Sequence, residues 1–171
     1  VPNGGNGIEI VQWNNWFGGG CTVSSSTVSG NGQNGIKVSA PDVKLLGVFV
    51  GVDKSGLNAL RNEFNGIDIG RNGANCAVNA FGEAELYRIS VISGNGANGV
   101  FTEGKATFVD GYIGLTRNGA PLPNNQHGVH VAEAAQSAEI GHVGSLCDST
   151  LCACSVSNNV LDGIHIEGEE A

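Results

Sequence analysis

Short alternations of apolar and variable residues recur along the chain at nearly constant intervals. Each copy begins with Asn, His or Asp followed by Gly. Three residues come next: an apolar residue, a variable residue, and a second apolar residue that is replaced by Thr in one copy. The copies begin at Asn6, Asn34, Asn65, Asn98, His127 and Asp162, so successive copies lie 28, 31, 33, 29 and 35 residues apart. Alternation with a period of two turns neighbouring side chains to opposite faces of a strand. The pattern predicts one short β-strand with one inner face in every repeat.

A longer period of 64 residues lies over the shorter one. The segments 26–38, 90–102 and 154–166 align without gaps, and 49–69 matches 112–131 after one deletion. Repeats of 20–50 residues are typical of solenoids, in which each coil stacks on the next. The sequence therefore predicts an all-β protein, a right-handed single-stranded parallel β-helix of about six coils with roughly 30 residues each. We expect one domain over residues 1–171, as a fragment of a longer chain.

Two other folds compete with the solenoid. An Asn-Gly pair between alternating runs is a strong signal for a β-hairpin. Here, however, the residues before such a pair often hold another one, as in Gly30-Asn-Gly-Gln-Asn-Gly, and not a strand of matching length. A sandwich or mixed fold is the remaining alternative.

The Asn-Gly pairs are expected to form the corners of the coils. Glycine adopts positive φ without strain, and Asn tolerates the same region. Stacked coils place equivalent residues about 4.8 Å apart, so Asn side chains would hydrogen-bond along the stack as a ladder. We expect Ser93, Asn95 and Asn98 to have this structural role.

Composition and charge limit the classes of partner. The chain of 171 residues has 28 Gly and 14% charged residues but 40% hydrophobic residues, too many for a disordered glycine-rich linker. A net charge of −8 repels a phosphate backbone, so no nucleic-acid partner is expected. The apolar runs are too short to span a bilayer, which argues against membrane insertion.

Five cysteines occur, and three of them, Cys147, Cys152 and Cys154, fall within eight residues. This spacing favours a disulfide-stapled loop with unknown pairing, and an extracellular or cell-surface location. Buried free thiols are the alternative. Zinc would need two paired ligand sets, which the spacing does not provide. We predict neither a metal site nor a cofactor.

Three segments resemble the repeats of the pectin-lyase-like superfamily of right-handed parallel β-helices. Ile92-Ser-Gly-Asn-Gly-Ala-Asn-Gly-Val resembles its I-S-G-N-x-x-x-G-V repeat; Val50-Gly-Val-Asp-Lys-Ser-Gly and Tyr112-Ile-Gly-Leu-Thr-Arg-Asn-Gly resemble its Y-I-G-T-D-x-x-G repeat. The resemblance implies the fold more than an activity, because such repeats serve structural, adhesive and enzymatic proteins. The catalytic signatures of polygalacturonases, pectate lyases and alginate epimerases do not occur in the chain.

The variable residues of the six copies are expected to form one outward column. Its members are Glu9, Lys37, Asp68, Phe101, His130 and His165. We predict that this column contacts carbohydrate, with Phe101 offering an aromatic face for a sugar ring. The alternative is a solvated ladder of opposite charges that has no ligand.

The same column supplies the candidates for catalysis. Lys37 or His130 could act as a general base that Asp68 orients, and alternate members match the carboxylate separations of glycosidases. His130 and His165 would be stacked neighbours, able to share a metal ion or to shift one another's protonation.

The leading hypothesis is an extracellular, non-catalytic β-helix module that is structural or contacts polysaccharide. The first alternative is a fragment of a polysaccharide lyase, epimerase or hydrolase. The second is a filament subunit, in which neighbouring chains stack on the ends of the solenoid.

Overall fold

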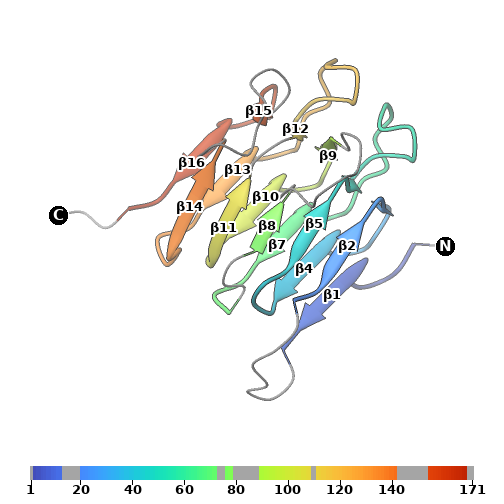
Figure 1. The fold of residues 1–171 in the computed structure, drawn as a ribbon. Helices are drawn as coiled ribbons and strands as arrows, with labels where there is room; N and C mark the ends of the chain where they lie inside the picture. The colour runs from blue at the N-terminus through green and yellow to red at the C-terminus, as the bar shows by residue number, and fades with distance from the viewer. Residues whose placement is uncertain are drawn as a thin grey trace, which may run out of the picture.

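The chain folds into stacked parallel strands. The computed structural model describes residues 2–12, 20–72, 76–78, 89–108, 111–141 and 154–168, and these ranges contain sixteen strands and no helix. The strands form three parallel sheets, and in each sheet a strand pairs with the one three places further along the chain. Figure 1 shows them side by side from the N-terminal to the C-terminal end. The predicted all-β class and the parallel stacking of repeats are confirmed.

Each sheet takes at most one strand from each coil. Sheet A consists of β1 (Ile8–Val11), β4 (Ile36–Ser39), β7 (Ile67–Ile69), β10 (Val100–Thr102), β13 (Val129–Val131) and β16 (Ile164–Ile166). Sheet B consists of β2 (Thr22–Ser24), β5 (Lys44–Leu46), β8 (Cys76–Val78), β11 (Lys105–Phe108) and β14 (Ser137–Ile140). Sheet C consists of β3 (Thr27–Val28), β6 (Phe49–Val50), β9 (Ser90–Ile92), β12 (Gly111–Ile113) and β15 (Cys154–Val156). The six strands of sheet A match the six predicted coils.

The inner faces of the sheets make the core. In β7 the side chains of Ile67 and Ile69 are fully buried, while Asp68 between them is turned outward and half-buried. Leu45 from sheet B and Val50 from sheet C are also fully buried in the same cluster. Burying each such side chain stabilises the fold by about 1.5–3 kcal/mol. The alternation seen in the sequence therefore separates inside from outside as predicted.

An inner ladder of asparagine side chains runs through the stack. Its rungs are Asn3, Asn31, Asn62, Asn95, Asn124 and Asn159. In each of the first five, the side-chain amide donates a hydrogen bond to the side-chain carbonyl of the next rung, at 3.0, 2.7, 3.0, 2.9 and 2.9 Å in turn. The predicted roles of Asn95 and Ser93 are confirmed: the Ser93 hydroxyl donates to the carbonyl of Leu115.

An outer ladder is formed by the first residue of each motif. Asn98 donates from its side-chain amide to the side-chain oxygen of Asn65 at 3.1 Å, and Asn34 donates in the same way to Asn6 at 3.2 Å. The backbone N–H of His127 continues the ladder by donating to the side-chain oxygen of Asn98 at 3.1 Å. The predicted ladder role of Asn98 is confirmed.

The glycine of the Asn-Gly pair has a different role from the one expected. Positive φ is found at earlier corners, such as Gly30 (73°) and Gly94 (71°), and not at Gly66 of the motif. A Cβ on Gly66 would lie 2.7 Å from the side-chain nitrogen of Asn95 and 2.6 Å from the carbonyl oxygen of Gly99. The motif glycine is therefore needed because the next coil and the inner ladder approach its Cα closely.

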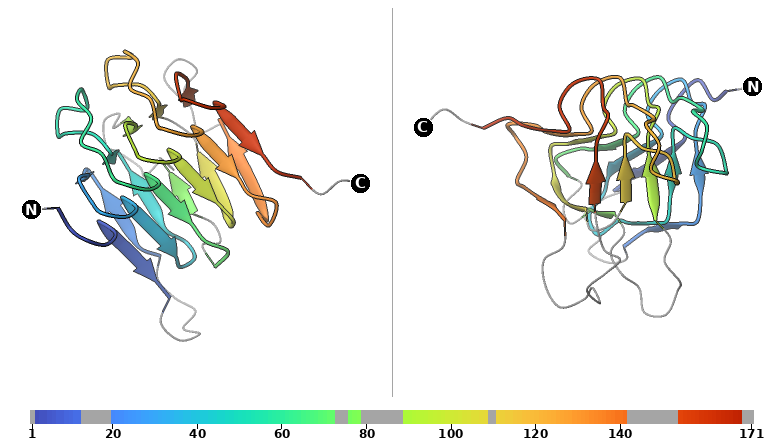
Figure 2. Two further views of the ribbon diagram at one scale, coloured as in Figure 1. Left: turned by 180° about the vertical axis from the view of Figure 1, so that it is seen from behind. Right: turned by 90° about the horizontal axis from the view of Figure 1, so that it is seen from above.

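Two loops project from the same side of the stack, one between β6 and β7 and one between β12 and β13 (Figure 2). Each closes on itself through an antiparallel bridge, Val52 with Ala59 and Leu115 with Pro121. The backbone N–H of Arg117 donates to the carbonyl of Gly56 at 2.9 Å and joins the loops. Within the described ranges there is no helix with the length and apolarity that a membrane crossing requires.

Candidate functional site

The outward column lies on sheet A as predicted. Strand pairing places its members opposite one another in an unbroken register: Glu9 with Lys37, Lys37 with Asp68, Asp68 with Phe101, Phe101 with His130, and His130 with His165. Glu9 is exposed and the other five are half-buried. The register of the column is confirmed, and its contact with carbohydrate stays a prediction.

Asp68 is the carboxylate most affected by its surroundings. Burial raises the pKa of its carboxyl above the ordinary value; the Lys37 charge and a hydrogen bond from the Asn65 side chain act in the opposite direction, and the Glu103 charge adds to the rise. Asp68 therefore keeps a proton to a higher pH than an exposed aspartate does.

The predicted catalytic residues are brought together only in part. Lys37 and Asp68 are direct neighbours, so the structure allows the pair that the sequence suggests. Phe101 separates Asp68 from His130. The Nε2 atom of His130 instead lies 2.9 Å from Oε1 of Glu167, so the expectation that Asp68 orients His130 is wrong.

Phe101 and His130 form an edge-to-face pair. Their ring centroids are 5.2 Å apart, and the ring planes are inclined by 87°. The imidazole of His130 is only 17% exposed and is held between this contact and Glu167. The Phe101 ring is thus supported on one side by a fixed polar neighbour.

A histidine cluster occupies the C-terminal end of sheet A. We give this name to His127, His130, Asp162, His165 and Glu167. The sequence prediction found the neighbours His130 and His165 but missed the other three. The signal was present in the motif, because its first residue is Asn in four copies and changes to His127 and Asp162 in the last two.

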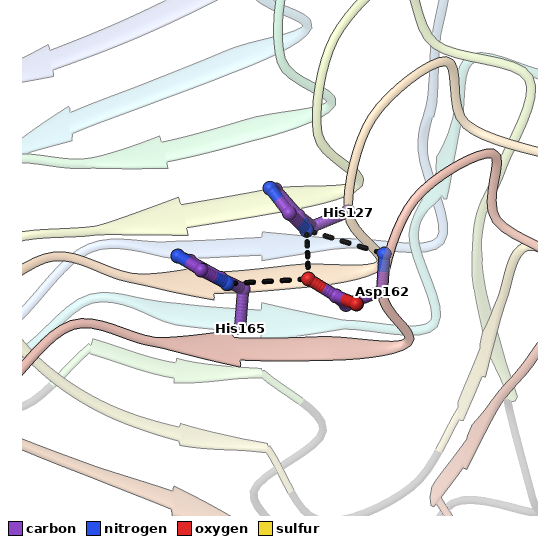
Figure 3. A group of neighbouring side chains, drawn as sticks. All are labelled: His127, Asp162 and His165. Atoms are coloured by element: carbon purple, nitrogen blue, oxygen red, sulfur yellow. Dashed lines mark hydrogen bonds and ion pairs between the residues drawn. The ribbon is translucent and has the colours of Figure 1, made fainter.

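The most compact part of the cluster is shown in Figure 3. The Oδ2 atom of Asp162 lies 3.2 Å from Nδ1 of His127 and 3.2 Å from Nδ1 of His165. The two imidazole rings stack at a centroid distance of 4.5 Å with an angle of 21° between planes. The backbone N–H of Asp162 also points to Nδ1 of His127, at 3.3 Å.

The charges of the cluster influence one another. Burial lowers the pKa of His127, the charges of His165 and His130 lower it further, and Asp162 opposes them. The pKa of Glu167 is lowered by a hydrogen bond from the Glu133 backbone and by its contact with His130. At neutral pH the cluster therefore combines neutral His127 with ionised Glu167.

A concavity of about 300 Å³ lies beside sheet C, away from the column. Lys54, Arg117, Phe49, Ser26 and Thr27 contribute to its lining, and no described lining residue is acidic or a histidine. The Arg117 guanidinium lies 5.9 Å from the centre of the Phe49 ring. Lys54 and Arg117 occupy equivalent positions in the 64-residue repeat, a signal that the sequence prediction did not use.

The cysteines are described only in part. Cys147 and Cys152 lie outside the described residues, so the predicted staple with Cys154 of β15 stays a prediction. Cys21 is an exposed free thiol and Cys76 a buried one. Burial raises the pKa of the Cys76 thiol to about 12.

Among the described strands, β16 at the end of sheet A has a neighbour on one side only. Its apolar residues Ile164 and Ile166 are 44% and 68% exposed, whereas Ile67 and Ile69 in β7 are fully buried. Such an edge can pair with a further coil. The stacking of neighbouring chains at the solenoid ends stays a prediction.

Comparisons with known proteins add no relative. No protein-family model matches the chain, and no curated protein and no solved structure matches it significantly.

Proposed function

We propose that this chain is an extracellular or cell-surface β-helix module of the pectin-lyase-like type, and that it contacts polysaccharide without cleaving it. The stacked parallel sheets are consistent with the repeats that resemble this superfamily. The proposal assigns the contact to the outward column of sheet A. A polymer lying along the stack would meet a new side chain at every coil, about 4.8 Å further on.

The observation that carries the proposal is the position of Phe101. Its ring lies between a carboxylate, Asp68, and an imidazole, His130, on adjacent strands of one regular sheet. An aromatic face stacks on a sugar ring, and polar groups beside it bind hydroxyl groups and fix orientation. The His130 contact holds the Phe101 ring in place before a ligand arrives.

The concavity beside sheet C differs in its chemistry from the outward column. Glycoside cleavage uses two acidic groups, or an acid and a base, that face the same bond. The described lining of the concavity offers Lys54 and Arg117 but no acid or histidine. The acids and histidines of the column lie instead on sheet A, where one strand after another presents a single side chain.

Affinity electrophoresis and calorimetry with a panel of neutral and uronic-acid polysaccharides would test the contact. We expect Phe101→Ala to weaken binding about tenfold, because an aromatic contact contributes about 0.5–1.5 kcal/mol beyond the burial of its area. Tyr112→Ala is the matched control, since Tyr112 is also an outward, half-buried aromatic residue but belongs to sheet C. Equal losses in both variants, or no binding to any polysaccharide, would overturn the proposal.

A polysaccharide-cleaving or epimerising enzyme is the second candidate function, and the raised pKa of Asp68 favours it. An acid that keeps its proton to a higher pH than an exposed aspartate can protonate a leaving group over a wider pH range, and Lys37 lies next to Asp68. New reducing ends, unsaturated products or epimerised residues in the same panel would identify this activity. Its loss in Asp68→Asn, with polysaccharide binding retained, would replace the non-catalytic proposal.

A further inference from the structure

The histidine cluster brings together side chains that bind metals. Three of the four histidines of the chain belong to the last two coils of sheet A. His127, Asp162 and His165 each offer one ligand atom, and these atoms lie within 4.8 Å of one another. His130, His165 and Glu167 meet the same condition, so His165 is common to both groups.

We propose that His127, Asp162 and His165 form a binding site for one divalent transition-metal ion of the zinc class. The ligand atoms are Nδ1 of each histidine and Oδ2 of the aspartate, which Figure 3 shows turned toward one another. The proposal goes beyond the polysaccharide contact and does not depend on it, because His127 and Asp162 are not members of the outward column.

The distances fit a tetrahedral ion. With bonds of about 2.0–2.1 Å to nitrogen and oxygen, a tetrahedral ion separates its ligand atoms by about 3.3–3.4 Å. Both Nδ1 atoms lie 3.2 Å from Oδ2 of Asp162. Two of the three separations between ligand atoms are therefore close to the tetrahedral value, and the third, between the two nitrogens, is within 4.8 Å. Three protein ligands leave a fourth position open for water or a ligand.

The surroundings of His127 prepare its Nδ1 atom for coordination. A metal binds the neutral imidazole, so protons and metal compete for the same nitrogen. The N–H of Asp162 faces Nδ1 of His127, which favours a lone pair on this atom and the proton on Nε2. At 3.3 Å this hydrogen bond is long, and a metal ion would replace it readily.

The ligand set selects the class of metal. Two imidazoles and one carboxylate suit Zn²⁺, Cu²⁺ or Ni²⁺, whereas Ca²⁺ takes six to eight oxygen ligands and Mg²⁺ retains several waters. Only one of the three proposed ligand atoms is an oxygen. We therefore expect Zn²⁺ to bind and Ca²⁺ not to bind.

The outer ladder gives independent support. In the first four coils, which we call the lower coils, its rungs are asparagines whose side chains hydrogen-bond to one another, as those of Asn65 and Asn98 do at 3.1 Å. His127 and Asp162 replace the amide in the last two coils, next to each other, and the outward column has a histidine in the same two coils. The departure from the repeat thus coincides with the place where the ligand atoms converge.

A metal ion at this site would join the last two coils. His127 precedes β13, whereas Asp162 and His165 belong to the coil that contains β16. The ion would therefore link residues 35 positions apart in the sequence. The pair of His130 and Glu167 lies beside His165, because the rings of His130 and His165 are in edge-to-face contact. This pair would support the position of His165 without contacting the ion.

The test uses the full chain after treatment with a chelator, and Zn²⁺ alone as the probe. Calorimetry should show one bound ion, and the melting temperature should rise with Zn²⁺ but not with Ca²⁺. The double variant His127→Asn/Asp162→Asn restores the amide rungs of the lower coils, so it should fold and melt normally without metal. We expect its affinity for Zn²⁺ to be at least a hundredfold lower. Glu9→Gln is the control for the loss of one carboxylate on the same sheet, and it should bind Zn²⁺ as the unmodified chain does.

His165→Gln is a second variant that removes a ligand if the double variant does not fold, and it should also lose Zn²⁺. Substitution of Co²⁺ for Zn²⁺ reports the ligand type. A visible spectrum without a thiolate charge-transfer band supports the site, and a strong thiolate band assigns the ion to the cysteines. Absence of Zn²⁺ binding, unchanged affinity in either variant, or loss of binding after thiol alkylation overturns the proposal.

Discussion

Asp68 lies in register beside Lys37, and yet the pKa of its carboxyl is raised. A neighbouring cation stabilises the ionised form of a carboxylate and ordinarily lowers its pKa. Here burial between adjacent strands outweighs the charge of Lys37, and Glu103 acts in the same direction as burial. The fold therefore makes ionisation of Asp68 less favourable than that of an exposed aspartate.

We expect Asp68→Asn to raise the melting temperature at pH 7. Because the pKa of Asp68 is higher in the folded state, its protonated form stabilises the fold. This contribution is complete below the ordinary pKa of 3.8 and is lost as the pH rises through the pKa of the folded state. The advantage of the variant should accordingly shrink as the pH falls towards 4. Thermal melts across this pH range measure the effect.

Glu9→Gln serves as the comparison, because Glu9 is an exposed carboxylate of the same column at the edge strand β1. Its melting curve should follow that of the unmodified chain at each pH. A lower melting temperature for Asp68→Asn at pH 7 would contradict the sign of the shift.

Asn62→Ala should destabilise the fold by about 3 kcal/mol. The Asn62 side chain is fully buried, accepts a hydrogen bond from Asn31 and donates one to Asn95. Each buried polar group that loses its partner costs about 1–3 kcal/mol. Urea denaturation measures the change. Asn3→Ala is the control: it removes an exposed rung at the end of the ladder and should lower the free energy of unfolding by less than about 1 kcal/mol. Similar losses of stability in both variants would mean that burial does not set the strength of the ladder.

Gly66→Ala should cost about 3 kcal/mol or more, because its methyl group would overlap the carbonyl oxygen of Gly99 and the side-chain nitrogen of Asn95. Gly4→Ala is the matched control: a Cβ there has no atom within 4 Å. Denaturant unfolding of both variants distinguishes close packing from a general effect of losing glycine. A stable Gly66→Ala chain would show that the coils can separate without loss.

Cys76 should resist alkylation in the folded chain. The thiolate is the reactive form, and burial raises the pKa of this thiol to about 12, so little thiolate exists at pH 8. Cys21 is exposed and should react first. Peptide mapping after iodoacetamide treatment, with and without denaturant, measures both sites. Modification of Cys76 as fast as Cys21 in the folded state would contradict its burial.

Most of the fold could be predicted from the sequence, because a solenoid converts equivalence in a repeat into proximity in space. Residues at the same repeat position stack about 4.8 Å apart, whatever lies between them in the chain. This rule predicted the column from Glu9 to His165, the inward positions of Ile67 and Ile69, and the ladder through Asn95.

The rule fails for residues at different repeat positions. His127 belongs to the outer ladder and His165 to the outward column, and yet their rings stack at a centroid distance of 4.5 Å. The pairing of His130 with Glu167 and not with Asp68 likewise joins residues at different repeat positions.

The sequence by itself determined the all-β class, the number of coils and which side chains face outward, since these follow from a period of two within strands and a period of about thirty between them. Only the tertiary structure decided why Gly66 must be glycine, how strongly Asp68 holds its proton, and which side chains meet around Asp162. These depend on the separation of atoms across coils and on their burial, and neither quantity is contained in a repeat pattern.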